Sequence, residues 1–125
     1  MKLRIATRGS NLALVQTRWV GSQLRTHFPD LDIEEVQVKT EGDRIQDRPL
    51  AQVGGKGLFV SEVEAVVVRG EADFAVHSLK DVPGDVPLAE GMGILSVPVR
   101  EDPRDVLVTI DGVDLESLKR GARVG

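Results

Sequence analysis

Short strand-like segments alternate with helical segments over the first part of this chain, and this alternation limits the folds that it can adopt. The strand-like segments are apolar and are expected at 3–7, 31–39 and 73–76. A helix follows the first of them, and a second apolar helix is expected at about 58–69, where Gly70 ends it. This order predicts an α/β fold with a mainly parallel sheet flanked by helices.

The first helix has recognisable ends and one face that is expected to be buried. Ser10 or Asn11 can cap its start, because both side chains accept hydrogen bonds from the unpaired amides of a first turn. Pro29 ends it. Apolar residues at roughly helical spacing predict the face that packs on the sheet: Leu12, Val15, Trp19, Leu24 and Phe28. The aromatic members of this set, together with Phe74, are expected in the core.

The other segments are less regular. Residues 41–52 are polar and show no steady period, which predicts a loop of the length that is usually functional. Farther along, a fourth strand is expected at 92–99, a further strand at 105–110 and a short helix at 115–120. The final residues, 122–125, resemble the first residues of another strand.

Charge and cysteine content exclude several classes of function. The chain has 16 basic and 20 acidic residues, a net charge of −4, which argues against a general nucleic-acid surface. The absence of cysteine excludes disulfides and thiolate metal sites, and His27 and His77 are too few for a histidine-rich one. No apolar run approaches the length of a membrane span, and the start has no signal-peptide architecture, so we expect a cytoplasmic protein.

The run from Val76 to Pro83 is the strongest chemical signal. It follows an apolar strand, and ligands of open α/β sheets bind outside the carboxyl ends of the strands. Lys80 can hold a carboxylate, and Asp81 can accept and return a proton or stabilise a developing cation. Ser78 adds a hydroxyl, whereas Leu79 is expected to point the opposite way. The alternative is a surface Lys–Asp pair that contributes little.

Two segments that contain glycine are further candidates. Arg8-Gly9-Ser10 lies where a strand meets a helix start, so its amides favour an anion and Arg8 can pair with a carboxylate. A simple helix cap beside a solvated arginine is the alternative. Gly54–Gly57 lacks the ending of a nucleoside-triphosphate loop, and predicts a hinge that moves Lys56 and Phe59 toward a site. A plain turn with Phe59 in the core is equally open.

Four motifs together resemble the porphobilinogen deaminase family, and the similarity covers nearly the whole chain. They are Ile5–Ser10, Val53–Phe59, Val76–Pro83 and Arg100–Asp105. Members of this family join porphobilinogen units head to tail, release ammonia at each step and form the linear tetrapyrrole hydroxymethylbilane. The resemblance implies a fold like that of the type II periplasmic binding proteins, porphobilinogen and the growing pyrrole chain as partners, and a monomeric full-length enzyme.

The resemblance also implies roles for individual residues. Asp81 would be catalytic: it would contact pyrrole nitrogens, protonate the leaving amine and stabilise the azafulvene-type cation. Phe59 would pack against a pyrrole ring. Because the family's proton chemistry is assigned to the aspartate, His77 is interpreted as a hydrogen-bonded structural residue. The acetate and propionate groups of cofactor and substrate would be bound by Arg8, Ser10, Lys56, Ser78 and Lys80.

The chain departs from the family pattern in two ways. Gln52 stands where many members have a lysine, which weakens one expected contact to the acidic pyrrole chain. The family's dipyrromethane cofactor is attached to a cysteine, and this chain has none. The resemblance therefore implies a truncated protein, with 1–99 as a first domain that lacks its returning segment and 100–125 as a hinge and the start of a second domain. Such a chain is expected to be inactive by itself.

Two other functions are compatible with the residues alone. A non-catalytic module that binds small organic anions would use the same cleft without making or breaking bonds. A nucleotide-binding α/β domain would rest on Gly54–Gly57.

Overall fold

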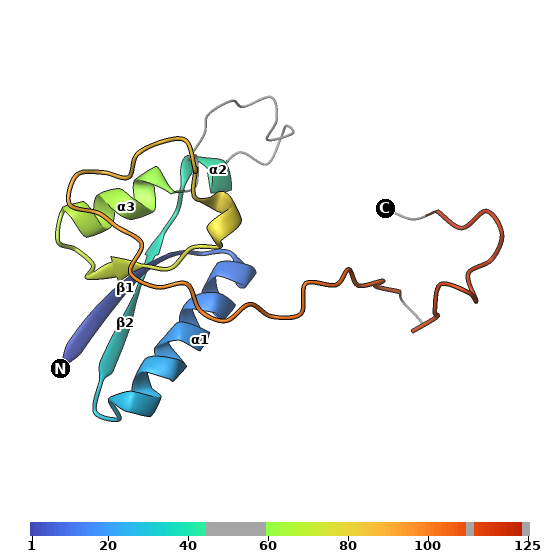
Figure 1. Cartoon of the computed structure of the whole chain (residues 1–125), viewed down its shortest axis with the longest axis horizontal. Coiled ribbons are helices and arrows are strands. Elements are labelled where there is room, and N and C mark those ends of the chain that lie inside the picture. Colours follow the sequence, from blue (N-terminus) through green and yellow to red (C-terminus); the bar gives the residue numbers. More distant parts are fainter. Residues whose placement is uncertain (45–59, 110–111, 124–125) are drawn as a thin grey trace. The chain divides into compact units, whose positions relative to one another are not determined.

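The computed structural model describes residues 1–44, 60–109 and 112–123, which form two units at 1–93 and 94–125 (Figure 1). The secondary structure lies in the first unit, which is the one that carries the candidate site. Its elements are β1 (Lys2–Arg8), α1 (Asn11–His27), β2 (Asp32–Val38), α2 (Glu41–Arg44), α3 (Ser61–Val68), β3 (Phe74–Ala75) and the 3-10 turn η2 (Leu79–Asp81).

The three strands form a parallel sheet in the order β2-β1-β3. Lys2 is opposite Asp32 at one end of the β1–β2 pair, and Arg8 is opposite Val38 at the other. On the other side of β1, Ile5 is opposite Phe74. The predicted parallel sheet is confirmed, and the first strand of the sequence is its centre.

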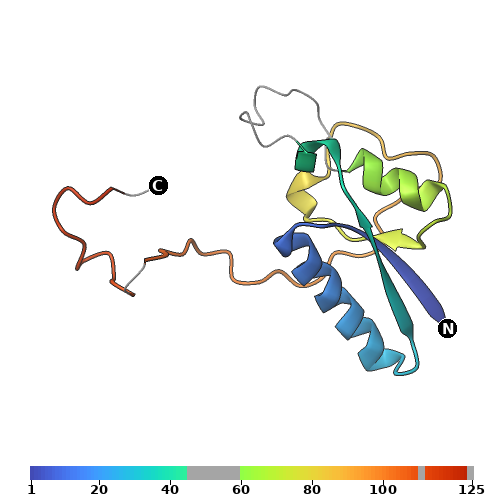
Figure 2. The same ribbon diagram turned by 180° about the vertical axis from the view of Figure 1, so that it is seen from behind.

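Both faces of β1 are covered. Ile5 and Ala6 are both 0% exposed, although consecutive side chains of a strand point to opposite faces. Ala6 packs with Val63 of α3, whereas Thr17 of α1 donates a hydrogen bond to Thr7 Oγ1 at 2.8 Å. The two helices therefore cover opposite faces, with the strands between them (Figures 1 and 2).

The ends of both long helices follow local rules. Ser10 caps α1 in an extended conformation, and its Oγ accepts a hydrogen bond from the Ala13 amide at 3.4 Å. At the end of α3, Gly70 has a φ of 70°, and the amides of Gly70 and Glu71 bond back to the carbonyls of Val67 and Val66. This is a Schellman motif, which favours glycine at the position with positive φ. The predicted cap and the predicted stop are confirmed.

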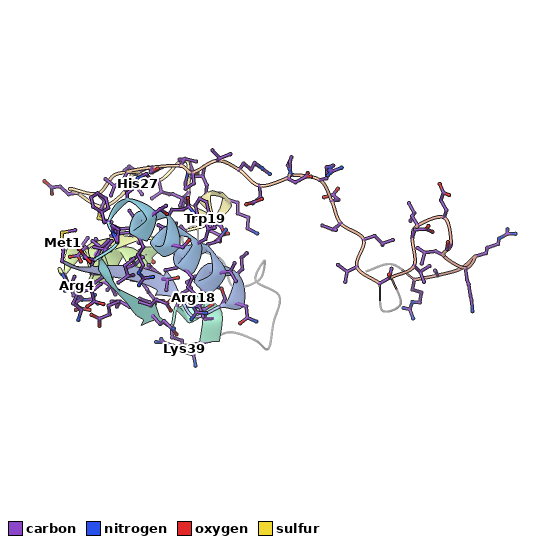
Figure 3. The ribbon with its side chains drawn as sticks, turned by 90° about the horizontal axis from the view of Figure 1, so that it is seen from below. Met1, Arg4, Arg18, Trp19, His27 and Lys39 are labelled. Carbon is purple, nitrogen blue, oxygen red and sulfur yellow. The ribbon has the colours of Figure 1, made fainter. Side chains whose placement is uncertain are left out.

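The predicted buried face of α1 is wrong. Leu12, Val15, Trp19 and Phe28 are between 42% and 64% exposed, whereas Thr17 and Gly21 are buried. A Cβ on Gly21 would lie 3.3 Å from Ile33 Cδ1, so the helix approaches β2 closely on its side of small residues. Figure 3 shows Arg18 and Trp19 on different sides of α1, and Arg18 forms an ion pair with Glu35 of β2 at 2.9 Å.

Residues 41–44 form a short helix, whereas a loop was predicted for 41–52; residues 45–52 lie outside the described part of the chain. Thr40 and Asp43 cap this helix reciprocally. The Asp43 amide donates to Thr40 Oγ1 at 3.2 Å, and the Thr40 amide donates to the Asp43 carboxylate at 3.2 Å. The spacing Thr-x-x-Asp is a variant of the capping box, which marks a helix start in a sequence.

The strands expected after residue 90 are not observed. Residues 92–99 and 105–109 have no strand structure, and Leu95, Val97 and Val99 are 63% to 94% exposed. The expected helix at 115–120 is reduced to turns. A strand needs a neighbour for its backbone hydrogen bonds. Among the described residues of the second unit, 94–125, no strand is present to supply them. The predicted division of the chain at residue 99 stays a prediction.

The described helices include none with the length and apolar character needed to cross a membrane.

The close approach at Gly21 generates a test of stability. Replacing Gly21 with Leu should lower the free energy of unfolding by about 1–3 kcal/mol, because the added side chain has no space against Ile33. A gain of helix propensity of up to about 1 kcal/mol opposes this loss. Gln23→Leu, at an exposed position of the same helix, is the control and should cost little. Urea unfolding of the two variants measures the difference; equal stabilities would contradict the packing described here.

Candidate functional site

The candidate site lies at the carboxyl ends of the neighbouring parallel strands β1 and β3. β1 has β2 on one side and β3 on the other, and the connecting helices run over opposite faces. In such sheets, the point where the strand order reverses leaves a crevice outside the carboxyl ends of the strands. The turn η2, drawn in gold, lies beside the amino-terminal end of α1 in both views (Figures 1 and 2).

A small cavity of about 30 Å³ occupies this crevice, which is room for about one water molecule. Three segments line it: the end of β1, the first turns of α1 and the residues after β3. The lining residues are Arg8, Ser10, Leu12, Ala13, Gln16, Val76, His77, Ser78 and Asp81. The structure thus brings together four of the predicted site residues that are far apart in the sequence, namely Arg8, Ser10, Ser78 and Asp81.

The remaining predicted residues have different outcomes. Lys80 lies on η2 beside Asp81, but its side chain is exposed and it does not line the cavity. Leu79 is 54% exposed on the same turn. Lys56 and Phe59, with the glycine segment around them, lie outside the described residues. Their predicted roles stay predictions.

Gln16 is a site residue that sequence reasoning missed. It lines the cavity from α1, and its side-chain carbonyl accepts a hydrogen bond from Ser78 Oγ at 2.8 Å. This bond joins the start of α1 to the segment after β3 across 62 residues of sequence. The only signal was its position on the first turns of the helix that follows Ser10.

Arg8 is held by a carboxylate of this chain. Its guanidinium donates through Nε to Asp43 Oδ2 at 3.3 Å and through Nη2 to Asp43 Oδ1. Only 20% of the Arg8 side chain and 19% of the Asp43 side chain are exposed. Thr40, which is fully buried, donates its hydroxyl to the same carboxylate at 2.8 Å. Sequence reasoning missed Asp43, although the spacing Thr-x-x-Asp could have indicated it.

Two opposing effects set the pKa of Asp43. Burial alone would raise it, but the hydrogen bonds from Arg8 and Thr40 outweigh burial and hold the pKa of this carboxyl below its usual value. Asp43 is therefore an anion at neutral pH, and the pair that it forms with Arg8 is a charged one.

His77 is an uncharged member of the site. Burial lowers its pKa below 6.5, the Asp81 carboxylate opposes this change, and the Arg8 guanidinium adds to it. Its Nε2 is buried and finds no hydrogen-bond partner among the described residues. The predicted hydrogen-bonded role is therefore not seen at Nε2, whose hydrogen-bonding capacity is unmet among the described residues.

A second, wider hollow lies on the other side of Ser10. It has a volume of about 490 Å³ and is lined by Gly9, Ser10, Gln37, Val38, Lys39 and Asp43, at the carboxyl ends of β1 and β2. This volume is within the range of pockets that hold small organic molecules. The small cavity has room for about one water molecule, whereas the wider hollow is an open depression of the surface.

The described lining offers donors that could bind an organic anion, together with a carboxylate and an imidazole that can exchange protons. Hydroxyls, an amide, an arginine and a neutral imidazole line the same cavity as Asp81. No cluster of three metal-ligating side chains occurs in residues 1–44, 60–109 and 112–123.

Comparison with known proteins gives a consistent picture. A sequence model described as "Porphobilinogen deaminase, dipyromethane cofactor binding domain" matches residues 3–125. The porphobilinogen deaminase of Geobacter sulfurreducens is 52% identical over 124 residues, which are 99% of this chain and 38% of that protein. The corresponding protein of Trichlorobacter lovleyi is also 52% identical over 124 residues, 99% of this chain and 39% of its own length. That of Geotalea uraniireducens is 50% identical over 123 residues, 98% and 38% respectively.

The buried imidazole of His77 generates a test of pH dependence. In the unfolded chain histidine titrates near 6.5. Because the folded protein binds this proton less readily, the free energy of unfolding should fall as the pH is lowered from about 6.5 through the folded pKa. His77→Gln should remove this component. NMR titration of the His77 ring should give a midpoint below 6.5; a midpoint at or above that value would contradict the described environment.

Proposed function

This chain belongs to the porphobilinogen deaminase family, and on that premise we propose that it supplies the proton-handling part of a hydroxymethylbilane synthase. The resemblance stated from its motifs is confirmed at the level of the family. Since the chain spans 38% or 39% of the length of the relatives named above, the activity of a whole enzyme is part of this proposal. The reaction is the stepwise condensation of porphobilinogen with release of ammonia.

The observation that supports the proposal is that Asp81 lines one cavity with an arginine and two serine hydroxyls. Asp81 lines the same cavity as Arg8, Ser10 and Ser78. In the proposed reaction, protonated Asp81 gives its proton to the departing amine of porphobilinogen, which leaves as ammonia, and it regains a proton from the attacking pyrrole carbon as the new carbon–carbon bond forms. While it is ionised, Asp81 accepts a hydrogen bond from a pyrrole N–H. The same carboxylate then stabilises the positive charge that develops on the ring as the amine leaves.

We assign binding of the acetate and propionate groups of the pyrroles to residues that line the cavity with Asp81. Arg8 would bind acetate or propionate oxygens, because ionised carboxylates form their strongest hydrogen bonds with charged donors. The hydroxyl of Ser10 would add a donor, and that of Ser78 would do so by exchanging its bond to the Gln16 carbonyl for one to the ligand. Lys80 is exposed beside them and would attract the same groups from solvent. We also retain the predictions that Lys56 contributes a cation and Phe59 a stacking face.

The residues present fit a dipyrromethane group in their chemistry. Such a group carries pyrrole N–H donors and carboxylates, for which Asp81 and Arg8 offer the complementary charges, and the orphaned Nε2 of His77 is a further polar contact. When bound, the cofactor would supply the pyrrole end to which new units are added. The rings would lie outside the small cavity, which has room for about one water molecule.

We further propose that the three-stranded α/β unit is part of a fold of the type II periplasmic binding protein kind. The full enzyme is proposed to be a cytoplasmic monomer that uses no nucleic acid. These statements rest on the family resemblance and on the parallel order β2-β1-β3.

A non-catalytic organic-anion module is the second candidate, because the same cavity lining would serve binding alone. Replacing Asp81 with Asn separates the two. The assay is a chimera in which this chain replaces the matching 124 residues of the Geobacter sulfurreducens enzyme. The Asp81→Asn chimera should lose at least about 100-fold in ammonia release, because general acid–base groups typically contribute that much.

Porphobilinogen binding to the same chimera is the accompanying measurement. The affinity for porphobilinogen should change only slightly in Asp81→Asn, since its acetate and propionate groups are proposed to bind other residues. Asp85→Asn, outside the cavity lining, is the matched control and should keep both properties. An unmodified chimera that binds porphobilinogen but releases no ammonia would support the simple binder, whereas ammonia release that is unchanged in Asp81→Asn would remove Asp81 from the catalytic role.

A further inference from the structure

The carboxylate of Asp43 is held in place by hydrogen bonds other than those from Arg8. It belongs to the capping box of α2, where the Thr40 amide and hydroxyl both donate to Oδ2, at 3.2 and 2.8 Å. The Asp43 amide bonds in return to Thr40 Oγ1 at 3.2 Å. Thr40 itself is 0% exposed. A carboxylate with this many bonds to one buried neighbour has little rotational freedom.

Arg8 meets this fixed group through one edge of its guanidinium. Nε and Nη2 bond to the two different oxygens of Asp43, which is the side-by-side geometry that orients an arginine most strictly. Arg8 stands at the end of β1 and lines the cavity with Asp81, whereas Asp43 lines the wider hollow beyond Ser10. The pair therefore joins the two hollows.

Arg4, on the same strand, forms a comparable ion pair with Asp73 away from both hollows. Arg4 donates through Nη2 to Asp73 Oδ1 at 2.8 Å and through Nη1 to the Gly70 carbonyl at 2.8 Å. This pair ties the turn before β3 to β1 and lines neither hollow. It is an internal reference for the structural value of an Arg–Asp pair on β1.

We propose that Asp43 is a positioning residue, which holds the guanidinium of Arg8 in the orientation that binds the carboxylate of an acidic pyrrole. This inference rests on the proposed function and adds a residue to it. An arginine side chain loses considerable rotamer entropy when it is ordered. If Asp43 has already ordered it, the ligand does not bear that cost on binding.

The negative charge of Asp43 acts in the opposite direction. It offsets the positive charge of Arg8 and so weakens the attraction for another anion. In the proposed role, the fixed orientation of Arg8 outweighs this weaker attraction. The two contributions predict opposite changes in ligand affinity when the charge of Asp43 is removed. Replacing Asp43 with Asn should therefore weaken ligand binding if orientation dominates, and strengthen it if charge dominates.

The first experiment needs no ligand. The Nε–Hε signal of Arg8 in the ¹⁵N-labelled 125-residue chain is assigned by its loss in Arg8→Lys. In the unmodified chain this signal should show slow exchange with solvent and an ordered side chain. Asp43→Asn should abolish that order, whereas Asp73→Asn should leave the Arg8 signal unchanged. An Arg8 signal that is equally ordered in Asp43→Asn would overturn the proposal.

The second experiment measures porphobilinogen affinity by calorimetry on the same chains. Asp43→Asn should raise the dissociation constant about tenfold, and Asp73→Asn by less than about twofold. Thr40→Val keeps the charge of Asp43 but removes a bond that fixes it, so it should weaken binding to an intermediate degree. An affinity that is unchanged or tighter in Asp43→Asn would overturn the positioning role.

The two experiments distinguish a failure of the positioning role of Asp43 from a failure of the proposed function. If the unmodified chain binds no porphobilinogen, the proposed function fails in this chain, while the Arg8 signal still decides whether Asp43 orders the guanidinium. If Asp43→Asn does not fold, Thr40→Val gives the answer: an Arg8 signal and an affinity that both match the unmodified chain would overturn the proposal.

Discussion

Burial of β1 on both faces is the constraint on which the rest of this structure depends. Ile5 packs under one helix layer and Ala6 under the other, and both are completely removed from solvent. A strand with two covered faces needs a neighbour on each edge, and β2 and β3 supply them in parallel. The two connections consequently run over opposite faces and meet again only at the carboxyl ends. That geometry creates the crevice that Arg8 enters from one side and Asp81 from the other.

The site combines one strong cation with groups that limit its freedom. Arg8 is bonded by Asp43, Ser78 by Gln16, and the imidazole of His77 is kept neutral by burial. Each of these contacts joins residues that the sheet brings together from distant parts of the chain. The proposed acidic-pyrrole site therefore needs no unusual residue types. It needs ordinary hydroxyl, guanidinium and carboxylate groups at the ends of two adjacent strands.

Local rules predicted much of this architecture, and they did so where a few neighbouring residues decide the conformation. The Ser10 cap, the stop at Gly70 and the three strands of the first unit follow from residues close in sequence. The same approach failed for α1, because it assumed that the more apolar stripe packs on the sheet. The helix packs through Thr17 and Gly21 instead, since small residues permit a close approach to Ile33. It also failed at 92–99, where apolar residues alone do not provide a neighbouring strand.

The sequence by itself determined the family, the order of strands and helices, and the motif residues at the two strand ends, because each of these is written in residue types at fixed spacing. Only the tertiary structure decided which residues complete the site. Gln16 and Asp43 carry no catalytic motif, and they matter because the fold places one beside Ser78 and the other beside Arg8. Hydrogen bonds between residues this far apart in the chain depend on the path of the backbone through space, and no local pattern records that path.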